Sequence, residues 1–198
     1  MYEKELAALK SRGRLRVRRV FSPVLVDLAS NDYLRLAHSR QLFDRAVDRL
    51  RRYDVFAPKA SQLVNGYHPI HRDFERFVAK LHGFESALVV GSGFLGNLAL
   101  FETLPRKGDL LLIDEEYHAS GVLSAKLTRG KVAFFTHNDA GDLRRKLERS
   151  AKANRIFVAV EGVYSMSGKL VEKSVIETAR ELGATLIIDE AHSGGVIG

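Results

Sequence analysis

The chain has 198 residues, 45% of them hydrophobic and 28% charged, with a formal net charge of +7 and no cysteine. This composition is typical of a folded globular protein rather than a disordered one, and it excludes disulfides and thiolate metal sites. No apolar run reaches the ~20 residues that a membrane span needs, and no signal peptide is evident. We therefore expect a cytoplasmic protein with no membrane partner.

Much of the positive charge lies in residues 10–19, which hold six lysines and arginines. A solvated basic face is the first interpretation of this segment. A patch for a phosphorylated or carboxylated ligand is the alternative. No nucleic-acid recognition motif accompanies the charge, so we predict no nucleic-acid partner.

The first part of the chain predicts few regular elements. We expect a helix over 3–12, a short strand over 24–28 and a helix over 39–53, where apolar residues recur at helical spacing. Residues 54–68 contain proline, glycine and small polar residues and predict a long loop. Long loops in compact domains tend to be functional.

From residue 69 onward, amphipathic helices alternate with short apolar strands. This alternation predicts an α/β fold with a mostly parallel sheet flanked by helices. Asn138 or Asp139 is the expected N-cap of one of these helices. The helices are expected over 69–82, 94–104, 118–127, 140–152 and 172–182, and the strands over 86–90, 109–113, 131–136, 156–160 and 184–188.

The last of these strands is an apolar run that we expect to be buried on both faces, and Asp189 follows it directly. Open α/β sheets bind their ligands outside the carboxyl ends of their strands. A buried carboxylate needs a cationic partner or several hydrogen-bond donors. The pattern therefore predicts a site for a positively charged group at Asp189.

A glycine motif supplies a second candidate site, because Gly91, Gly93 and Gly96 match G-x-G-x-x-G between a predicted strand and a predicted helix. Asp114 lies at the end of the next predicted strand, as in dinucleotide-binding proteins. Small residues at a helix N-terminus let backbone N–H groups approach a phosphate. The motif favours a phosphate over a dinucleotide, and a tight turn without a ligand stays open.

Several short motifs follow one another along the chain in a specific order and spacing. They are Ser30–Leu34, Asn65–Tyr67 with His71, Ser92–Phe94 with Asn97, Tyr117–Ser120, His137–Asp139, Glu161–Met166, and Asp189–His192 with Gly195–Gly198. With these motifs the chain resembles the N-terminal part of an α-oxoamine synthase, a pyridoxal-phosphate (PLP) enzyme that condenses an amino acid with an acyl-CoA and releases CO2. The resemblance covers nearly the whole chain and implies the large domain of PLP-dependent transferase fold type I.

The resemblance also implies roles for particular residues. Asp189 would pair with the pyridinium nitrogen of PLP, His192 would lie near the phenolic oxygen, and His118 would cover the ring face; these three are the predicted catalytic residues. The predicted cofactor-binding residues are Ser92, Gly93, Phe94, His118, Ser165, Asp189 and His192. The predicted substrate-binding residues are Asn31, Tyr33, Gly66 and Tyr67. No metal site is predicted, because His68 and His71 have no third ligand.

The resemblance further implies how the chain is organised. Residues 1–60 would form an N-terminal extension and the start of the substrate pocket, and residues 61–198 would form a PLP-binding large domain that is incomplete at its C-terminal end. The substrates would be an acyl-CoA, with pimeloyl-CoA favoured, and an amino acid such as L-alanine. The complete protein would be a homodimer.

Two departures from the family pattern bear on function. Gln62 stands where arginine is common. The family's Schiff-base lysine lies beyond the Asp-x-x-His strand and is not in this chain, so we expect no C-terminal domain and no activity from the chain alone. The alternatives are a non-catalytic partner or binding subunit and, on the glycine motif, an NAD-binding oxidoreductase.

Overall fold

The computed structural model describes residues 2–22 and 24–197. Met1, Pro23 and Gly198, which the predicted regions include, lie outside the described residues. The chain divides into two units, residues 1–33 and 34–198, and the predicted boundary at residue 60 stays a prediction. Within the described ranges, no helix is both long enough and apolar enough to cross a membrane.

Among its described residues, the first unit contains one helix, α1 (Glu3–Ser11), as predicted. The strand expected over 24–28 is wrong, because this segment forms a turn and irregular chain. Asp27 accepts hydrogen bonds from the backbone N–H groups of Ala29 and Ser30, both at 3.0 Å. Such a local turn competes with strand pairing, so an apolar run alone did not produce a strand here.

The second unit begins with two helices joined by polar contacts, α2 (Arg40–Leu50) and α3 (Pro69–His82). Asp73 of α3 accepts from Arg49 at 2.7 Å and from the Tyr53 hydroxyl at 3.1 Å. The predicted loop between them holds a short helical turn, η2 (Gln62–Gly66), and a 3-10 turn, η1 (Leu36–His38), precedes α2. These contacts fix the two helices against each other.

Four parallel strands form the sheet, and the predicted mostly parallel sheet is therefore confirmed. They are β1 (Leu110–Asp114), β2 (Lys131–Phe135), β3 (Ile156–Glu161) and β4 (Thr185–Asp189). Their order in the sheet is β2-β1-β3-β4, so the chain crosses over through helices between strands. All four strands present their carboxyl ends at one edge.

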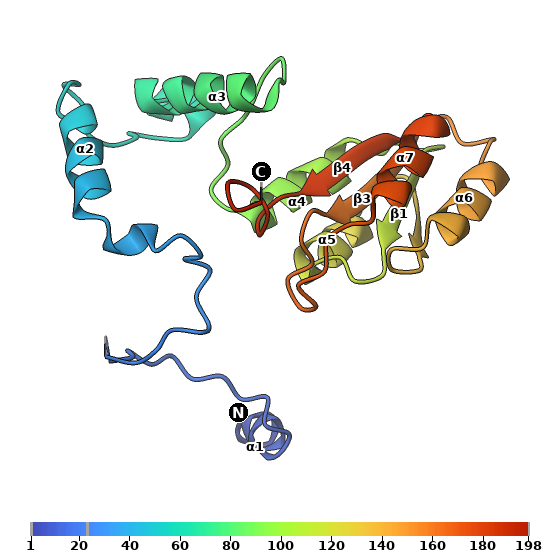
Figure 1. The fold of residues 1–198 in the computed structure, drawn as a ribbon, viewed down its shortest axis with the longest axis horizontal. Helices are drawn as coiled ribbons and strands as arrows, with labels where there is room; N and C mark the ends of the chain where they lie inside the picture. Colours follow the sequence, from blue (N-terminus) through green and yellow to red (C-terminus); the bar gives the residue numbers. More distant parts are fainter. Residues whose placement is uncertain (1, 23, 198) are drawn as a thin grey trace. The chain divides into compact units, whose positions relative to one another are not determined.

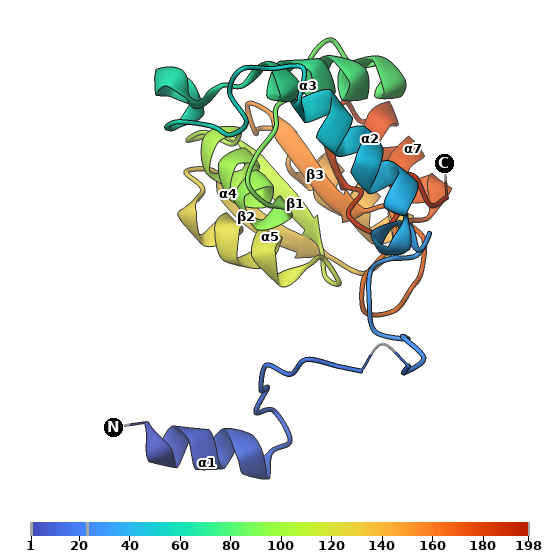
Figure 2. The same ribbon diagram turned by 90° about the vertical axis from the view of Figure 1, so that its left-hand side faces the viewer.

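Helices cover both faces of this sheet, as predicted (Figures 1 and 2). On one face, Leu143 and Leu147 of α6 (Ala140–Arg149) and Val175 of α7 (Lys173–Glu181) pack on alternate strand residues. On the other face, Phe101 of α4 (Gly93–Thr103) packs with Ala125, which follows α5 (Ala119–Ser124) and opens the 3-10 turn η3 (Ala125–Leu127). The core thus has two layers, one on each side of the strands.

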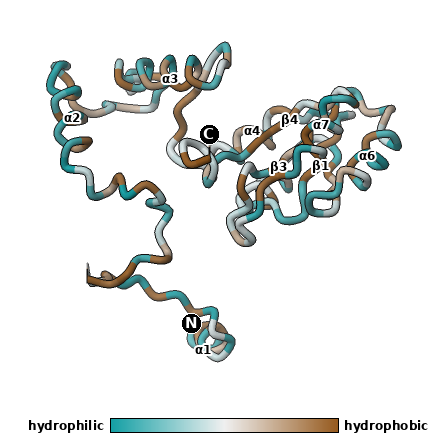
Figure 3. Tube along the Cα trace, viewed as in Figure 1, coloured by the Kyte–Doolittle hydropathy of each residue, from teal (hydrophilic) through white to brown (hydrophobic). Residues whose placement is uncertain are grey.

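Two strand predictions fail in this unit. β4 is not buried on both faces: it lies at the end of the strand order, and Ile187 is 8% exposed whereas Ile188 is 38% exposed. The middle of the strand is nevertheless hydrophobic (Figure 3). The strand expected over 86–90 is absent, because no described strand pairs with it. Side chains hold this segment instead: Val89 donates to Glu75 at 2.8 Å and accepts from Gln62 at 3.2 Å.

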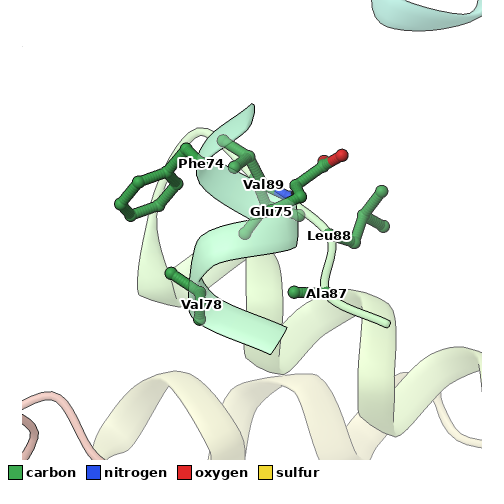
Figure 4. Close-up of a pocket in the computed structure, with 7 residues that line it drawn as sticks. Phe74, Glu75, Val78, Ala87, Leu88 and Val89 are labelled. Carbon is green, nitrogen blue, oxygen red and sulfur yellow. The ribbon is translucent and has the colours of Figure 1, made fainter. Parts of the chain in front are cut away.

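A cavity of about 220 Å³ lies between α3 and this extended segment (Figure 4). Phe74, Glu75 and Val78 line it from α3, and residues 87–90 line it from the other side. None of its lining residues belongs to the predicted site. The cavity is therefore not where the sequence places the chemistry.

Candidate active site

Strand register sorts three carboxylates at the carboxyl edge of the sheet. Glu161 at the end of β3 is paired with Asp189 at the end of β4. Asp114 ends β1 one position earlier, because Ile113 pairs with Ala159. Side chains alternate between the two faces of a strand, so Glu161 and Asp189 share the face covered by α4 and α5, whereas Asp114 belongs to the face covered by α6 and α7.

Asp114 is fully buried and its carboxylate is already occupied. It accepts from His137 Nδ1 at 2.9 Å and from the backbone N–H groups of Glu116 at 2.9 Å and Asn138 at 3.1 Å. In a dinucleotide-binding fold the acid at this position binds a ribose hydroxyl. Because Asp114 is buried and already accepts three hydrogen bonds, it argues against that use of the glycine motif.

Asp189 is half-buried and is held by neutral donors. Its Oδ2 accepts from Asn97 Nδ2 at 3.0 Å, and its Oδ1 accepts from the backbone N–H of Ala191 at 3.0 Å. Among the described residues no cation forms an ion pair with it. An ionised carboxylate has about four acceptor positions, so two remain for the positively charged group that the sequence predicts.

His118 is connected to this carboxylate by hydrogen bonds that run through the side chains of Ser120 and Asn97. It is the N-cap of α5, and its Nδ1 accepts from the backbone N–H of Ser120 at 3.2 Å. The Ser120 hydroxyl is 2.7 Å from the same nitrogen. His118 itself is exposed, so the face of its ring is accessible to a ligand.

Glu161 ties His118 to Ser165. One carboxylate oxygen accepts the backbone N–H of His118, and the other accepts the backbone N–H of Ser165 at 3.2 Å. Glu161 is only 2% exposed. Burial raises its pKa, and the nearby charge of Asp189 acts in the same direction, while the two N–H bonds oppose the rise.

Asn97 joins these groups to α4. Its side chain is buried; Nδ2 donates to Ser120 Oγ at 2.9 Å as well as to Asp189, and Oδ1 accepts the Tyr117 hydroxyl at 2.9 Å. Asn97, Tyr117 and Ser120 belong to the motifs described above, but the sequence alone assigns them no role. One signal could have identified Asn97, since it is the only polar residue between Gly93 and Phe101 in an otherwise apolar helix.

The N-terminus of α4 is the third part of the site. The Ser92 hydroxyl caps it by accepting from the backbone N–H of Leu95 at 3.2 Å. A Cβ built on Gly93 would meet no atom within 4 Å, so the space above this first turn is open. The first N–H groups of a helix have no acceptor within it and suit an anion such as phosphate. Ser92, Gly93 and Phe94 are exposed at this end.

These groups fit the cofactor that the resemblance implies. A carboxylate that accepts only neutral donors suits a pyridinium nitrogen, the exposed imidazole suits a ring face, and the helix N-terminus suits a phosphate. The structure brings together Asp189, His118 and α4 through Asn97, and Ser165 through Glu161. His192 lies half-buried in the turn after β4, and its role stays a prediction.

The contacts described for the predicted substrate residues Gly66 and Tyr67 do not involve the hydrogen bonds around Asn97. Tyr67 donates its hydroxyl to Glu75 of α3. Gly66 is buried against the 60–61 backbone, where a Cβ would lie 1.6 Å from the Ala60 carbonyl oxygen. Asn31 and Tyr33 belong to the first unit. Substrate binding by these four residues stays a prediction.

Residues 23–198 match the family described as aminotransferase class I and II. An 8-amino-7-oxononanoate synthase of Helicobacter pylori strain J99 is 50% identical over 199 residues, which covers 100% of this chain and 53% of that protein. The chain thus spans about half the length of the curated relatives that it matches.

Solved structures show the same fold. An 8-amino-7-oxononanoate synthase from Francisella tularensis superposes with a TM-score of 0.66 and 27% identity over 85% of this chain and 46% of that one. A structure described as SPT with PLP has a TM-score of 0.75 and 27% identity over 82% of this chain and 41% of that one. The expected fold of a PLP-dependent transferase large domain is therefore confirmed.

Proposed function

Because the chain belongs to the aminotransferase class I and II family, we propose that it is the cofactor-binding part of a PLP-dependent α-oxoamine synthase. The complete protein condenses an amino acid with an acyl-CoA and releases CO2. The 50% identical relative is named 8-amino-7-oxononanoate synthase, and this name supports L-alanine and pimeloyl-CoA as substrates and a place in biotin biosynthesis.

One observation carries the proposal. A single buried amide, that of Asn97, hydrogen-bonds both Asp189 and Ser120, the serine that contacts the His118 ring. Asn97 sits one turn into the helix whose open N-terminus suits a phosphate. Carboxylate, imidazole and anion-binding turn are thereby joined from three separate segments, in the combination that PLP requires.

The residues then have distinct tasks. When bound, PLP supplies an electron sink for the carbanion of the amino acid. Asp189 keeps a proton on the pyridine nitrogen, His118 covers one ring face, and the backbone N–H groups of Ser92–Phe94 bind the phosphate. Glu161 holds the backbone of His118 and Ser165 in place. The attacking lysine of the family is expected C-terminal to His192.

PLP binding by the 198-residue chain tests the first half of the proposal. We would titrate the chain with PLP and follow its absorbance, then repeat the titration with Asp189→Asn. Asparagine keeps the shape but removes the charge that holds the pyridinium proton, so the spectrum should shift and the affinity should fall at least about tenfold, since a charged hydrogen bond contributes roughly 1.5–3 kcal/mol.

Glu190→Gln is the matched control for this titration. Glu190 is the next residue in the chain, and its carboxylate accepts the Ser193 hydroxyl at 2.9 Å, which the glutamine carbonyl can still accept. It should bind PLP nearly as the parent does. An equal or larger loss in Glu190→Gln than in Asp189→Asn would refute the assignment of Asp189.

Activity tests the second half. In a protein extended to the length of its relatives, CoA should be released from pimeloyl-CoA only when L-alanine is present, and Asp189→Asn should reduce this rate by several orders of magnitude. Residues 1–198 alone should give no CoA release and, after borohydride treatment with PLP, no stoichiometric pyridoxyl-lysine. Robust turnover by residues 1–198 would show that the proposed lysine is misplaced. A homodimer and a cytoplasmic location stay predictions.

A further inference from the structure

The hydrogen bonds around Asn97 leave little freedom for the placement of protons. A backbone N–H can only donate, so the bond from Ser120 N to His118 Nδ1 makes this nitrogen an acceptor. Nδ1 therefore carries no proton, and a neutral His118 ring carries its proton on Nε2. With Nδ1 as the acceptor, the Ser120 hydroxyl, 2.7 Å from the same nitrogen, is a second donor that shares its single lone pair.

The direction of the next bond follows. Because the Ser120 hydroxyl proton is directed at His118, its oxygen accepts from Asn97 Nδ2 at 2.9 Å. The second proton of the same NH2 group goes to Asp189 Oδ2 at 3.0 Å. One amide thus donates toward both predicted cofactor contacts, and its two bonds cannot change independently.

Tyr117 fixes which way this amide points. Its hydroxyl donates to Asn97 Oδ1 at 2.9 Å. Burial raises the pKa of Tyr117, and the charge of Asp189 raises it further, so the phenol stays protonated and remains a donor. A flipped amide would point its oxygen at the Asp189 carboxylate. The network therefore defines one orientation of Asn97 from both ends.

We propose that Asn97, oriented by Tyr117, is the positioning residue of this site: one N–H holds the Asp189 carboxylate, and the other, through the Ser120 hydroxyl, keeps the His118 ring proton on Nε2. The site then presents an acceptor at Asp189 and an N–H donor at His118. The proposal deepens the proposed function and rests on it, because the two positioned groups are the predicted PLP contacts.

Imidazole nitrogen shifts test the proposal without any cofactor. The 198-residue chain, labelled with 15N-histidine, would be measured above the ordinary range of histidine titration, with His118 assigned from the signals lost in His118→Gln. In the parent, His118 should be mainly the tautomer with its proton on Nε2. Ser120→Ala removes the hydroxyl but keeps the backbone N–H, and the ratio of Nε2–H to Nδ1–H should fall about fivefold, equivalent to the ~1 kcal/mol of one hydrogen bond.

The matched variants separate positioning from general stability. Ser124→Ala deletes another buried hydroxyl of α5, which donates to the Ser120 carbonyl at 2.6 Å; it should lower the melting temperature and leave the His118 tautomer unchanged. Ser120→Thr keeps a hydroxyl and should restore the parent ratio. Asn97→Leu should shift the ratio in the same direction as Ser120→Ala. Tyr117→Phe should also shift it in this direction, and this variant replaces Asn97→Leu in the experiment if Asn97→Leu does not fold.

A second measurement addresses Asp189. With PLP labelled with 15N in its ring, the ring nitrogen should be protonated in the parent chain and shifted toward the neutral form in Asn97→Leu or Tyr117→Phe. If PLP binds neither the parent nor the variants, the proposed function is wrong. The His118 tautomer still tests whether Asn97 positions the site. A parent His118 with its proton on Nδ1, or a Ser124→Ala shift equal to that of Ser120→Ala, would overturn the inference.

Discussion

Replacing Glu161 with alanine should loosen two site residues at once. The carboxylate accepts the backbone N–H groups of His118 and Ser165, and each N–H left without an acceptor costs about 1–3 kcal/mol. Two such losses set a range of about 2–6 kcal/mol for the fall in the free energy of unfolding. The released burial cost of the charge, which is the main cause of the raised pKa of Glu161, acts in the opposite direction.

The lower half of that range is expected. His118 and Ser165 are exposed, so water can replace part of the missing acceptor, and a net loss of about 2–3 kcal/mol follows. Domains are usually stable by ~5–15 kcal/mol, so the variant should still fold. Urea unfolding would measure the loss, and native-state hydrogen exchange should show faster exchange at these two amides.

Glu172→Ala is the control for this experiment. Glu172 is exposed, and its side chain makes no capping hydrogen bond to α7, so its replacement should change the free energy of unfolding by less than about 0.5 kcal/mol. If the amides of His118 and Ser165 exchange in Glu161→Ala as they do in the parent, the carboxylate does not hold them and the reasoning is refuted.

Two further predictions concern pH and packing. Because burial raises the pKa of Glu161, its stabilising contribution is complete below the ordinary pKa of glutamate and is lost as pH rises through the folded pKa. Urea titrations over this pH range should show that the free energy of unfolding of the parent falls relative to that of Glu161→Gln. A rise would contradict the burial argument. Gly66→Ala places a Cβ 1.6 Å from the Ala60 carbonyl oxygen and should cost at least about 3 kcal/mol or prevent folding, whereas Gly96→Ala, with its nearest contact at 3.6 Å, should not; equal stabilities would show that the 60–66 loop is not packed as described.

The sequence predicts the sheet better than it predicts its surroundings. The strands β1 to β4 were expected to within one residue at each end, because short apolar runs between amphipathic helices have one good arrangement. The expected strands at 24–28 and 86–90 have the same apolar character but no neighbouring strand. Hydropathy records the side chains of a segment and not whether its backbone finds a partner.

The candidate site shows the same division. The family resemblance predicts the roles of Asp189 and His118. In the structure Asn97 bonds directly to Asp189 and is linked to His118 through the Ser120 hydroxyl. The bond between Asn97 and Asp189 spans 92 residues of sequence, and no local pattern encodes it. The N-cap of α6 illustrates the local case: Asp139 accepts from Asp142 at 2.9 Å, while Asn138, the alternative, adopts a left-handed φ of 54° and bonds to the 170–172 segment.

Because side chains alternate between the two faces of a strand, the number of residues in β4 determines the face on which Asp189 lies. Asp114 and Asp189 lie on opposite faces only because β1 and β4 end at positions of opposite parity in the shared register. Inserting or deleting one residue within β4 would carry Asp189 to the face that holds Asp114 and His137, away from Asn97. A change of two residues would return it. In active related proteins, insertions and deletions within this strand should therefore involve even numbers of residues, and odd-numbered changes should occur in the loop that follows.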